Sequence, residues 1–172
     1  MGKKTKSAAR EWVIAAVVAA ALVLIIRSFL FAPYEVYGQS MEPTFKGSEL
    51  LIINKLIYDV KDPQYGDIIV FHTAEQSDYI KRVIGKAGDR IEVRDGKVYR
   101  NGRPLKEPYL NEQKILGDFP TTVVPKGHVF AMGDNRNHSQ DSRKIGPVAI
   151  DQIAGRADVQ LTPLKDMKFL FP

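Results

Sequence analysis

Apolar residues are distributed unevenly, in one long block near the N-terminus and in many short runs after it. Residues 12–26 are uninterrupted apolar sequence, and after two polar positions a second run, 29–32, continues the block. At about 1.5 Å per residue, a helix over residues 12–32 would match the roughly 30 Å hydrocarbon core of a bilayer. We therefore expect one transmembrane helix at 12–32, preceded by a cytoplasmic tail at 1–11.

The downstream runs are short and separated by turn residues, which is typical of antiparallel β-strands. Asp95-Gly96 and Asn101-Gly102 supply the positive φ angles that tight type I′ hairpin turns need. Residues 104–120 lack periodicity and are expected to form a loop. Strands are expected around residues 50–53, 68–72, 79–84, 90–94, 97–100, 121–124, 128–132 and 156–161.

The predicted fold class is therefore mainly β. An antiparallel β-sheet domain over residues 33–172, with a small hairpin and loop insertion at 86–126, would follow one N-terminal transmembrane helix. A domain of this length has room for one core.

The charge distribution gives the helix an orientation. The net charge of +5 looks at first like a nucleic-acid signal, but residues 1–11 alone carry +3. From Tyr34 onward there are 20 basic and 19 acidic residues, a net charge of +1, so no nucleic-acid partner is expected. Basic residues before the helix place the N-terminus in the cytoplasm and the β domain outside the cell membrane.

Two other interpretations of the apolar block compete with an anchor. A cleaved secretory signal peptide should end in a small-x-small site, but here the only small residue of the final run, Ala32, precedes Pro33. A buried core helix would be apolar on all sides, and a domain this small covers such a helix with difficulty. An uncleaved anchor fits the pattern better than either.

Candidate chemistry begins at the turn of residues 38–44. Ser40 lies there between glycine and proline, and by itself it would be an ordinary turn residue. A serine hydroxyl becomes a nucleophile only with a base to take its proton. The chain has no cysteine, which excludes disulfides, zinc-thiolate sites and cysteine nucleophiles. Among the three histidines, His138 with Asp134 or Asp141 could complete a Ser-His-Asp triad.

Lys81 is the other candidate base. It lies in the middle of the expected strand at 79–84, where a period of two puts Tyr79 and Val83 on its own face. A lysine amine acts as a base only when burial lowers its pKa by a few units from about 10.4. A lysine on an edge strand, pointing into water, is the competing interpretation, and strand pattern alone leaves both open.

Residues 133–143 form the most polar stretch of the chain and directly follow an apolar strand. Interleaved Asp and Arg residues favour a loop that is bonded internally, because Arg–carboxylate forks fix backbone geometry. Metal binding by His128, Asp134, His138 and Asp141 is conceivable, but their spacing matches no familiar ligand pattern. No metal is expected.

Four motifs follow the apolar block in a defined order. They are Gly-x-Ser-Met-x-Pro-Thr at 38–44, Gly-Asp-Ile-Ile-Val-Phe at 66–71, Tyr-Ile-Lys-Arg-Val-Ile-Gly at 79–85, and Gly-Asp-Asn-Arg with Ser-x-Asp-Ser-Arg within 133–143. Together with the anchor they resemble bacterial type I signal peptidase over nearly the whole chain. The short insertion is similar to the compact Gram-positive type.

The resemblance implies a Ser-Lys dyad with Ser40 as nucleophile and Lys81 as general base. It implies that Ser139 orients the lysine amine, that Met41 shapes the substrate pocket and that the Ser40 backbone N–H contributes to the oxyanion hole. The charged residues implied to hold the loop together are Asp134, Arg136, Asp141 and Arg143. No cofactor is implied, and the implied partners are signal-peptide-bearing preproteins and the lipid bilayer.

Three positions depart from the family pattern. His138 occupies a position where asparagine is usual, beside Ser139, which places the hydrogen bonding there in question. Gly38 stands where some members carry a hydroxyl residue that donates to the oxyanion, so the second donor is unassigned. Residues 86–89 replace a commoner apolar-Pro-Gly-Asp turn.

Two further function classes remain as alternatives. A self-cleaving repressor would use the same dyad, but such proteins lack an N-terminal anchor. A catalytically silent, membrane-tethered β domain that binds peptides would be favoured if Ser40 or Lys81 were missing, and neither is.

Overall fold

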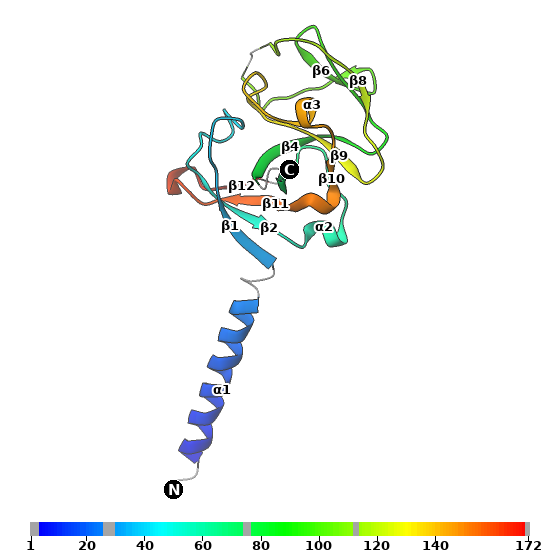
Figure 1. Ribbon diagram of the computed structural model, residues 1–172. Helices are drawn as coiled ribbons and strands as arrows, with labels where there is room; N and C mark the ends of the chain where they lie inside the picture. The colour runs from blue at the N-terminus through cyan, green and yellow to red at the C-terminus, as the bar shows by residue number, and fades with distance from the viewer. Residues whose placement is uncertain (1–3, 26–29, 74–76, 112–113, 171–172) are drawn as a thin grey trace.

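The computed structural model describes residues 4–25, 30–73, 77–111 and 114–170 (Figure 1). The helices are α1 (Lys4–Ile25), α2 (Ile57–Val60) and α3 (Ser142–Ile145), with 3-10 turns η2 (Ile150–Gln152) and η3 (Leu164–Asp166). The strands are β1 (Phe31–Glu35), β2 (Leu50–Asn54), β3 (Ile68–His72), β4 (Asp78–Lys86), β5 (Arg90–Arg94), β6 (Lys97–Arg100), β7 (Arg103–Pro104), β8 (Phe119–Val123), β9 (His128–Met132), β10 (Val148–Ala149), β11 (Ile153–Gln160) and β12 (Lys168–Phe169).

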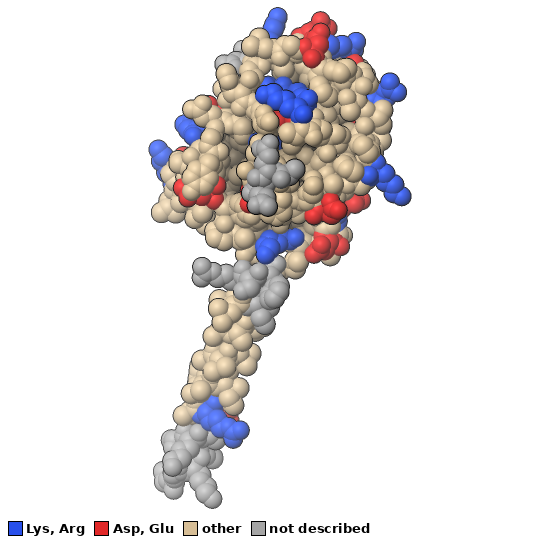
Figure 2. All heavy atoms as spheres, in the orientation of Figure 1, with Lys and Arg blue, Asp and Glu red and all other residues tan. Residues whose placement is uncertain are grey.

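The N-terminal helix α1 stands apart from the strands (Figure 1). Its side chains are exposed at every position from Ala8 to Leu24, and the face seen in Figure 2 is free of charge between the basic group near its lower end and the grey residues above. Within the described residues, no helix combines the length and the apolarity that a membrane crossing requires.

The expected span at 12–32 differs from the structure at its C-terminal end. Residues 26–29, including Arg27, lie outside the described residues. Phe31 and Ala32 belong to β1, which pairs antiparallel with β2. Pro33 lacks a backbone N–H and is compatible with β1 because this strand is at the edge of the sheet.

In the described part of the chain, the main sheet has eight strands, seven of them in the order β1-β2-β11-β3-β4-β9-β10, with β12 paired to β11. All its pairings are antiparallel, which confirms the predicted mainly β class. Ile68 and Val70 of β3 pack into one apolar cluster and Ile69 and Phe71 into another. Burial on both faces explains the uninterrupted apolar sequence of this central strand.

A smaller antiparallel sheet, in the order β7-β6-β5-β8, occupies the upper part of Figure 1. Both predicted turns are present, because Asp95 and Gly96 have φ angles of 52° and 75°, and Asn101 and Gly102 have 55° and 76°. Positive φ at two successive residues is the requirement of a type I′ hairpin.

The small sheet packs on the part of the main sheet that includes β4. One buried cluster joins Ile84 of β4 and Phe130 of β9 to Ile91 and Val93 of β5. Gly85 makes this packing close, since a Cβ at that position would collide with the Ile91 side chain. The small sheet is therefore anchored to the strand that carries Lys81.

Candidate active site

The fold brings Ser40 and Lys81 into contact, although they are 41 positions apart. Ser40 lies in the turn that follows β1, and Lys81 lies within β4. Lys81 Nζ lies 2.9 Å from Ser40 Oγ and donates to the Ile80 carbonyl oxygen at 2.8 Å. Both partners of the amine are neutral, so its hydrogen bonds do not require it to be charged.

Burial makes Lys81 a candidate base. The residue is 3% exposed. Desolvation by burial lowers the pKa of Lys81 from 10.5 to about 8, against the opposing charges of Asp141 and Asp134. The expected neighbour Tyr79 has its ring 5.0 Å from Nζ. A lysine with this pKa is partly neutral near physiological pH and can then accept a proton.

The turn that holds Ser40 is bonded to the loop of residues 133–143. Asn135 donates its backbone N–H to the Ser40 carbonyl at 3.0 Å and its side-chain amide to the Gln39 carbonyl at 3.0 Å. A Cβ at Gly133 would overlap both the Ser40 carbonyl oxygen and the Ser139 hydroxyl. Gly38 begins the turn at φ 79°, a conformation in which a side chain would be strained.

The four charged loop residues are all buried or partly buried, and they pair in two different ways. Asp141 is forked by Arg143 within the loop, with contacts of 2.8 Å to each carboxylate oxygen. Burial would raise the pKa of Asp141, but the Arg143 hydrogen bond and charge and the Gly133 N–H lower it overall. This pair fits the predicted internally bonded loop.

The other two charged residues pair outside the loop. Asp134 accepts from Arg82 on β4 at 2.9 and 2.6 Å. Arg136 donates to Glu107 at 2.8 and 2.6 Å. The loop is thus held from two sides, by the strand that carries Lys81 and by the segment after β7.

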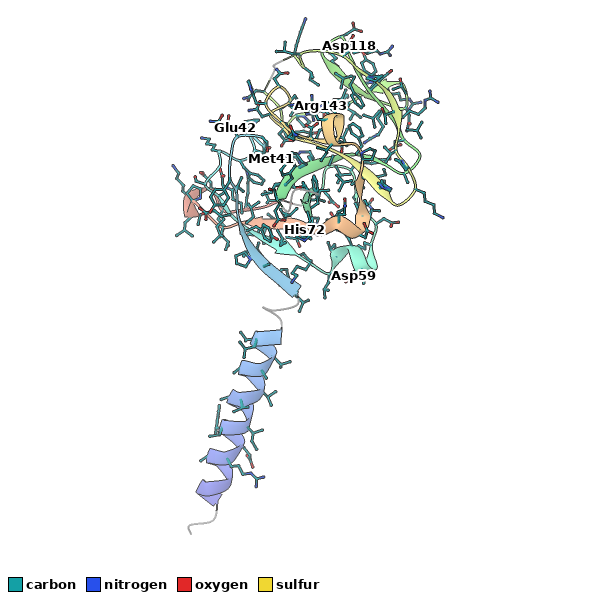
Figure 3. The ribbon with its side chains drawn as sticks, in the orientation of Figure 1. Met41, Glu42, Asp59, His72, Asp118 and Arg143 are labelled. Carbon is teal, nitrogen blue, oxygen red and sulfur yellow. The ribbon has the colours of Figure 1, made fainter. Side chains whose placement is uncertain are left out.

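A groove of about 590 Å³ opens at the Ser40 and Lys81 pair. Two extended segments, residues 33–37 and 77–81, provide most of its lining. Met41, which is 1% exposed, also lines it. Figure 3 labels Met41 in the turn after β1 and Arg143 in α3.

Among the described residues, neither Ser139 nor His138 hydrogen-bonds to Ser40 or Lys81. The Ser139 hydroxyl is buried and makes no hydrogen bond at standard geometry among the described residues. It lies close enough to Asp141 to help lower the pKa of that carboxyl group. His138 is exposed and borders a second, polar depression of about 230 Å³ on the other side of the turn. Lys81, rather than a histidine, contacts Ser40 Oγ.

Three of the four candidate metal ligands have other partners. Asp134 and Asp141 face arginines, and His128 Nδ1 lies 3.0 Å from the Lys126 carbonyl. Within the described ranges, no group of three or more His, Asp or Glu side chains is arranged to hold a metal ion.

Sequence reasoning missed several residues that support the site. Arg82 lies next to Lys81 in its motif, and the signal that could have identified it is a charged residue inside an apolar strand. Thr44 donates to Asp134 at 2.5 Å and lies in the serine motif. Glu107 and Tyr109 lie in the aperiodic segment expected to be a loop, and no pattern marks them.

Comparison with known proteins places these features in context. The family model described as "Signal peptidase, peptidase S26" matches residues 9–162. Signal peptidase I of Bacillus caldolyticus is 43% identical over 99% of this chain and 100% of its own length. Signal peptidase I T of Bacillus subtilis (strain 168) is 39% identical, covering 96% and 92%. A crystal structure of a signal peptidase I from Enterococcus faecalis V583 is 35% identical with a TM-score of 0.51, covering 56% of this chain and 97% of that one.

Proposed function

Because the chain belongs to the signal peptidase family, peptidase S26, and is a serine endopeptidase, we propose that Ser40 and Lys81 form its catalytic dyad. The reaction is removal of N-terminal signal peptides from exported preproteins. The observation that carries the proposal is the 2.9 Å contact between Ser40 Oγ and the buried Lys81 amine, whose pKa is lowered to about 8.

Acylation begins from the neutral amine. The Ser40 hydroxyl donates to Lys81 Nζ, which takes the proton as the oxygen attacks the scissile carbonyl carbon. The resulting ammonium then returns the proton to the leaving amine of the mature protein. An acyl-enzyme on Ser40 remains, and neutral Lys81 activates the water that hydrolyses it.

The tetrahedral oxyanion needs donors at the turn. We assign one donor to the backbone N–H of Ser40. Gly38 carries no hydroxyl, so the second donor must come from elsewhere. Losing one such donor typically costs about 100- to 1,000-fold in rate, which makes its identity a leading question for this chain.

The substrate would bind as an extended strand. The segments at 33–37 and 77–81 both border the groove, so a peptide between them can bond to backbone on either side. Met41 forms part of the wall, which suits the small residues of cleavage sites. Asp134, Arg136, Asp141 and Arg143 hold the adjoining loop, and Ser139 is proposed to orient the Lys81 amine. No cofactor takes part.

The membrane is the proposed partner of the N-terminal helix. The apolar side chains from Trp12 to Leu24 are exposed, and a bilayer would cover them. The proposed organisation is a cytoplasmic tail at 1–11, a single-pass anchor at 12–32 and an extracytoplasmic domain at 33–172 with the insertion at 86–126. The anchor then confines the enzyme to the cell membrane, where its substrate is also held.

The test is incubation of the full-length chain with a preprotein that carries an Ala-x-Ala site. Wild type should release the mature protein, while Ser40→Ala and Lys81→Ala should each abolish processing without unfolding the domain. His138→Ala serves as the matched control and should retain processing. Processing by Lys81→Ala together with loss in His138→Ala would replace the dyad with a histidine triad.

A further inference from the structure

Glu107 is a largely buried carboxylate outside both sheets, in the segment that follows β7. Its side chain is 9% exposed and that of its partner Arg136 is 3% exposed. Both guanidinium Nη atoms of Arg136 bond to it, and the Tyr109 hydroxyl donates to its Oε1 at 2.8 Å. Burial would lower the pKa of Arg136, but Glu107 raises it overall. The ion pair is thus the main compensation for a buried charge.

Arg136 connects this carboxylate to the backbone around the nucleophile. Its Nε donates to the Gly133 carbonyl at 3.0 Å, and its own carbonyl accepts from Arg143 Nη2 at 2.6 Å. Gly133 is packed directly against the Ser40 carbonyl, and the neighbouring Asn135 bonds to the same carbonyl. Displacing the Arg136 side chain would therefore move the backbone that holds Ser40.

Tyr109 connects the same segment to the base. Its ring lies 3.9 Å from the guanidinium carbon of Arg82, which follows Lys81 on β4. Arg82 is in turn forked by Asp134. A guanidinium stacked on an aromatic face and paired with a carboxylate has little freedom to move. The segment thus contacts the residue next to the base and the loop that bonds to the nucleophile.

We propose that Glu107, with Tyr109, is a positioning residue of the signal peptidase reaction. Glu107 holds Arg136 and Tyr109 holds Arg82, so that Ser40 and Lys81 stay within hydrogen-bond distance of each other. The inference rests on the proposed dyad and adds residues from outside the four motifs. It gives the small insertion a role in catalysis beyond stability. Misplacement of reacting groups by about 1 Å can cost roughly 100-fold in rate, so a smaller disturbance has a measurable effect.

The experiment compares kcat and KM of full-length variants in detergent micelles on a soluble Ala-x-Ala peptide. Glu107→Gln keeps the shape but removes the charge, and it should lower kcat roughly tenfold while KM stays within about twofold. Tyr109→Phe removes one donor to Glu107 and keeps the ring over Arg82, so its kcat should fall by less. Glu107→Asp, which keeps the charge, should recover part of the loss.

Glu92→Gln is the matched control, because Glu92 lies in the same insertion, 86–126, and pairs at 3.4 Å with the exposed Arg94. Its kcat should equal wild type. If Glu107→Gln lowers Tm but has the kcat of this control, Glu107 is only a tether and the inference fails. Should Glu107→Gln not fold, Tyr109→Phe decides, and a wild-type kcat there overturns the proposal.

Lys81→Ala in the same series separates the two claims. If Lys81→Ala keeps its activity, the proposed dyad is wrong whatever Glu107 does. If Lys81→Ala is inactive and Glu107→Gln is fully active, only the positioning role is lost.

Discussion

Lys81 and Arg82 are consecutive cations on β4, and both are buried, with 3% and 8% of each residue exposed. Their surroundings differ. Arg82 is forked by the carboxylate of Asp134, whereas Lys81 contacts a hydroxyl and a carbonyl. Successive side chains of a strand point to opposite faces, so one position along the chain separates the two environments.

The difference shows how this site assigns roles to two like charges. The guanidinium of Arg82, forked by Asp134, is a structural link between β4 and the loop. Burial without a bonded carboxylate lowers the pKa of the amine, here to about 8, and makes it a base. Asp141 and Asp134 act on Lys81 only through their charges, without a direct bond.

The largest effect is expected when the Lys81 amine is removed, because the proposed base is then lost. Lys81→Met should lower the rate of peptide cleavage by roughly 100- to 10,000-fold, the usual contribution of a general base. The same change should stabilise the fold, because the folded-state pKa of about 8 is below the unfolded value of 10.5. That penalty is complete below pH 8, fades as the pH rises from 8 to 10.5, and is absent above.

The free energy of unfolding at pH 7 should therefore rise by on the order of 3 kcal/mol in Lys81→Met. Denaturant unfolding at pH 7 and at a pH above 10.5 measures this, with a gain at pH 7 that disappears at the higher pH. A variant less stable than wild type at pH 7 would show that burial of the Lys81 amine does not destabilise the folded state.

Replacing Asp134, the carboxylate partner of Arg82, tests the structural role of the second cation. Asp134→Asn leaves a buried guanidinium without its charged partner, which should destabilise the fold by about 3 kcal/mol. Asp118→Asn, at an exposed position (Figure 3), is the control and should change stability by less than about 0.5 kcal/mol. Thermal unfolding compares them, and equal Tm values would mean that Asp134 contributes no net stability.

The smallest effect is expected far from both cations. Deleting residues 1–25 leaves β1 intact and should reduce cleavage of a membrane-embedded preprotein about tenfold, because the shared membrane raises the effective concentration of enzyme at its substrate. Cleavage of a soluble peptide should change less than about twofold. An equal loss on both substrates would indicate that the helix supports the fold rather than the encounter.

Much of the β architecture could be predicted from pattern. Strands β3, β5, β6 and β9 begin and end at the predicted residues, and Asp95-Gly96 and Asn101-Gly102 form the predicted turns. These features are local, governed by side-chain alternation and by the φ preferences of glycine. The apolar pattern extends the predicted span into strand β1, because Phe31 and Ala32 are as apolar as the helix before them and only pairing with β2 distinguishes them.

The site could be predicted only as far as its motifs extend. Ser40 and Lys81 could be recognised from the motifs that contain them, and the structure shows that they are in contact. The partners of Asp134 and Arg136 were not, because Arg82 and Glu107 are distant in sequence and meet them only through sheet packing. Ion pairs formed between distant segments leave no periodic pattern in the sequence. The contacts that residues 104–120 make with the site can therefore be identified only from the structure.

The most direct test of the central claim is the pH dependence of kcat/KM on a soluble peptide, which reports the pKa of the essential base in the free enzyme. With Lys81 as base, the rate should rise with pH along a limb of apparent pKa about 8 and fall tenfold per unit below it. A rate that is flat from pH 5 to 9, or a limb near the histidine value of about 6.5 that disappears in His138→Ala, would contradict the Ser40–Lys81 dyad.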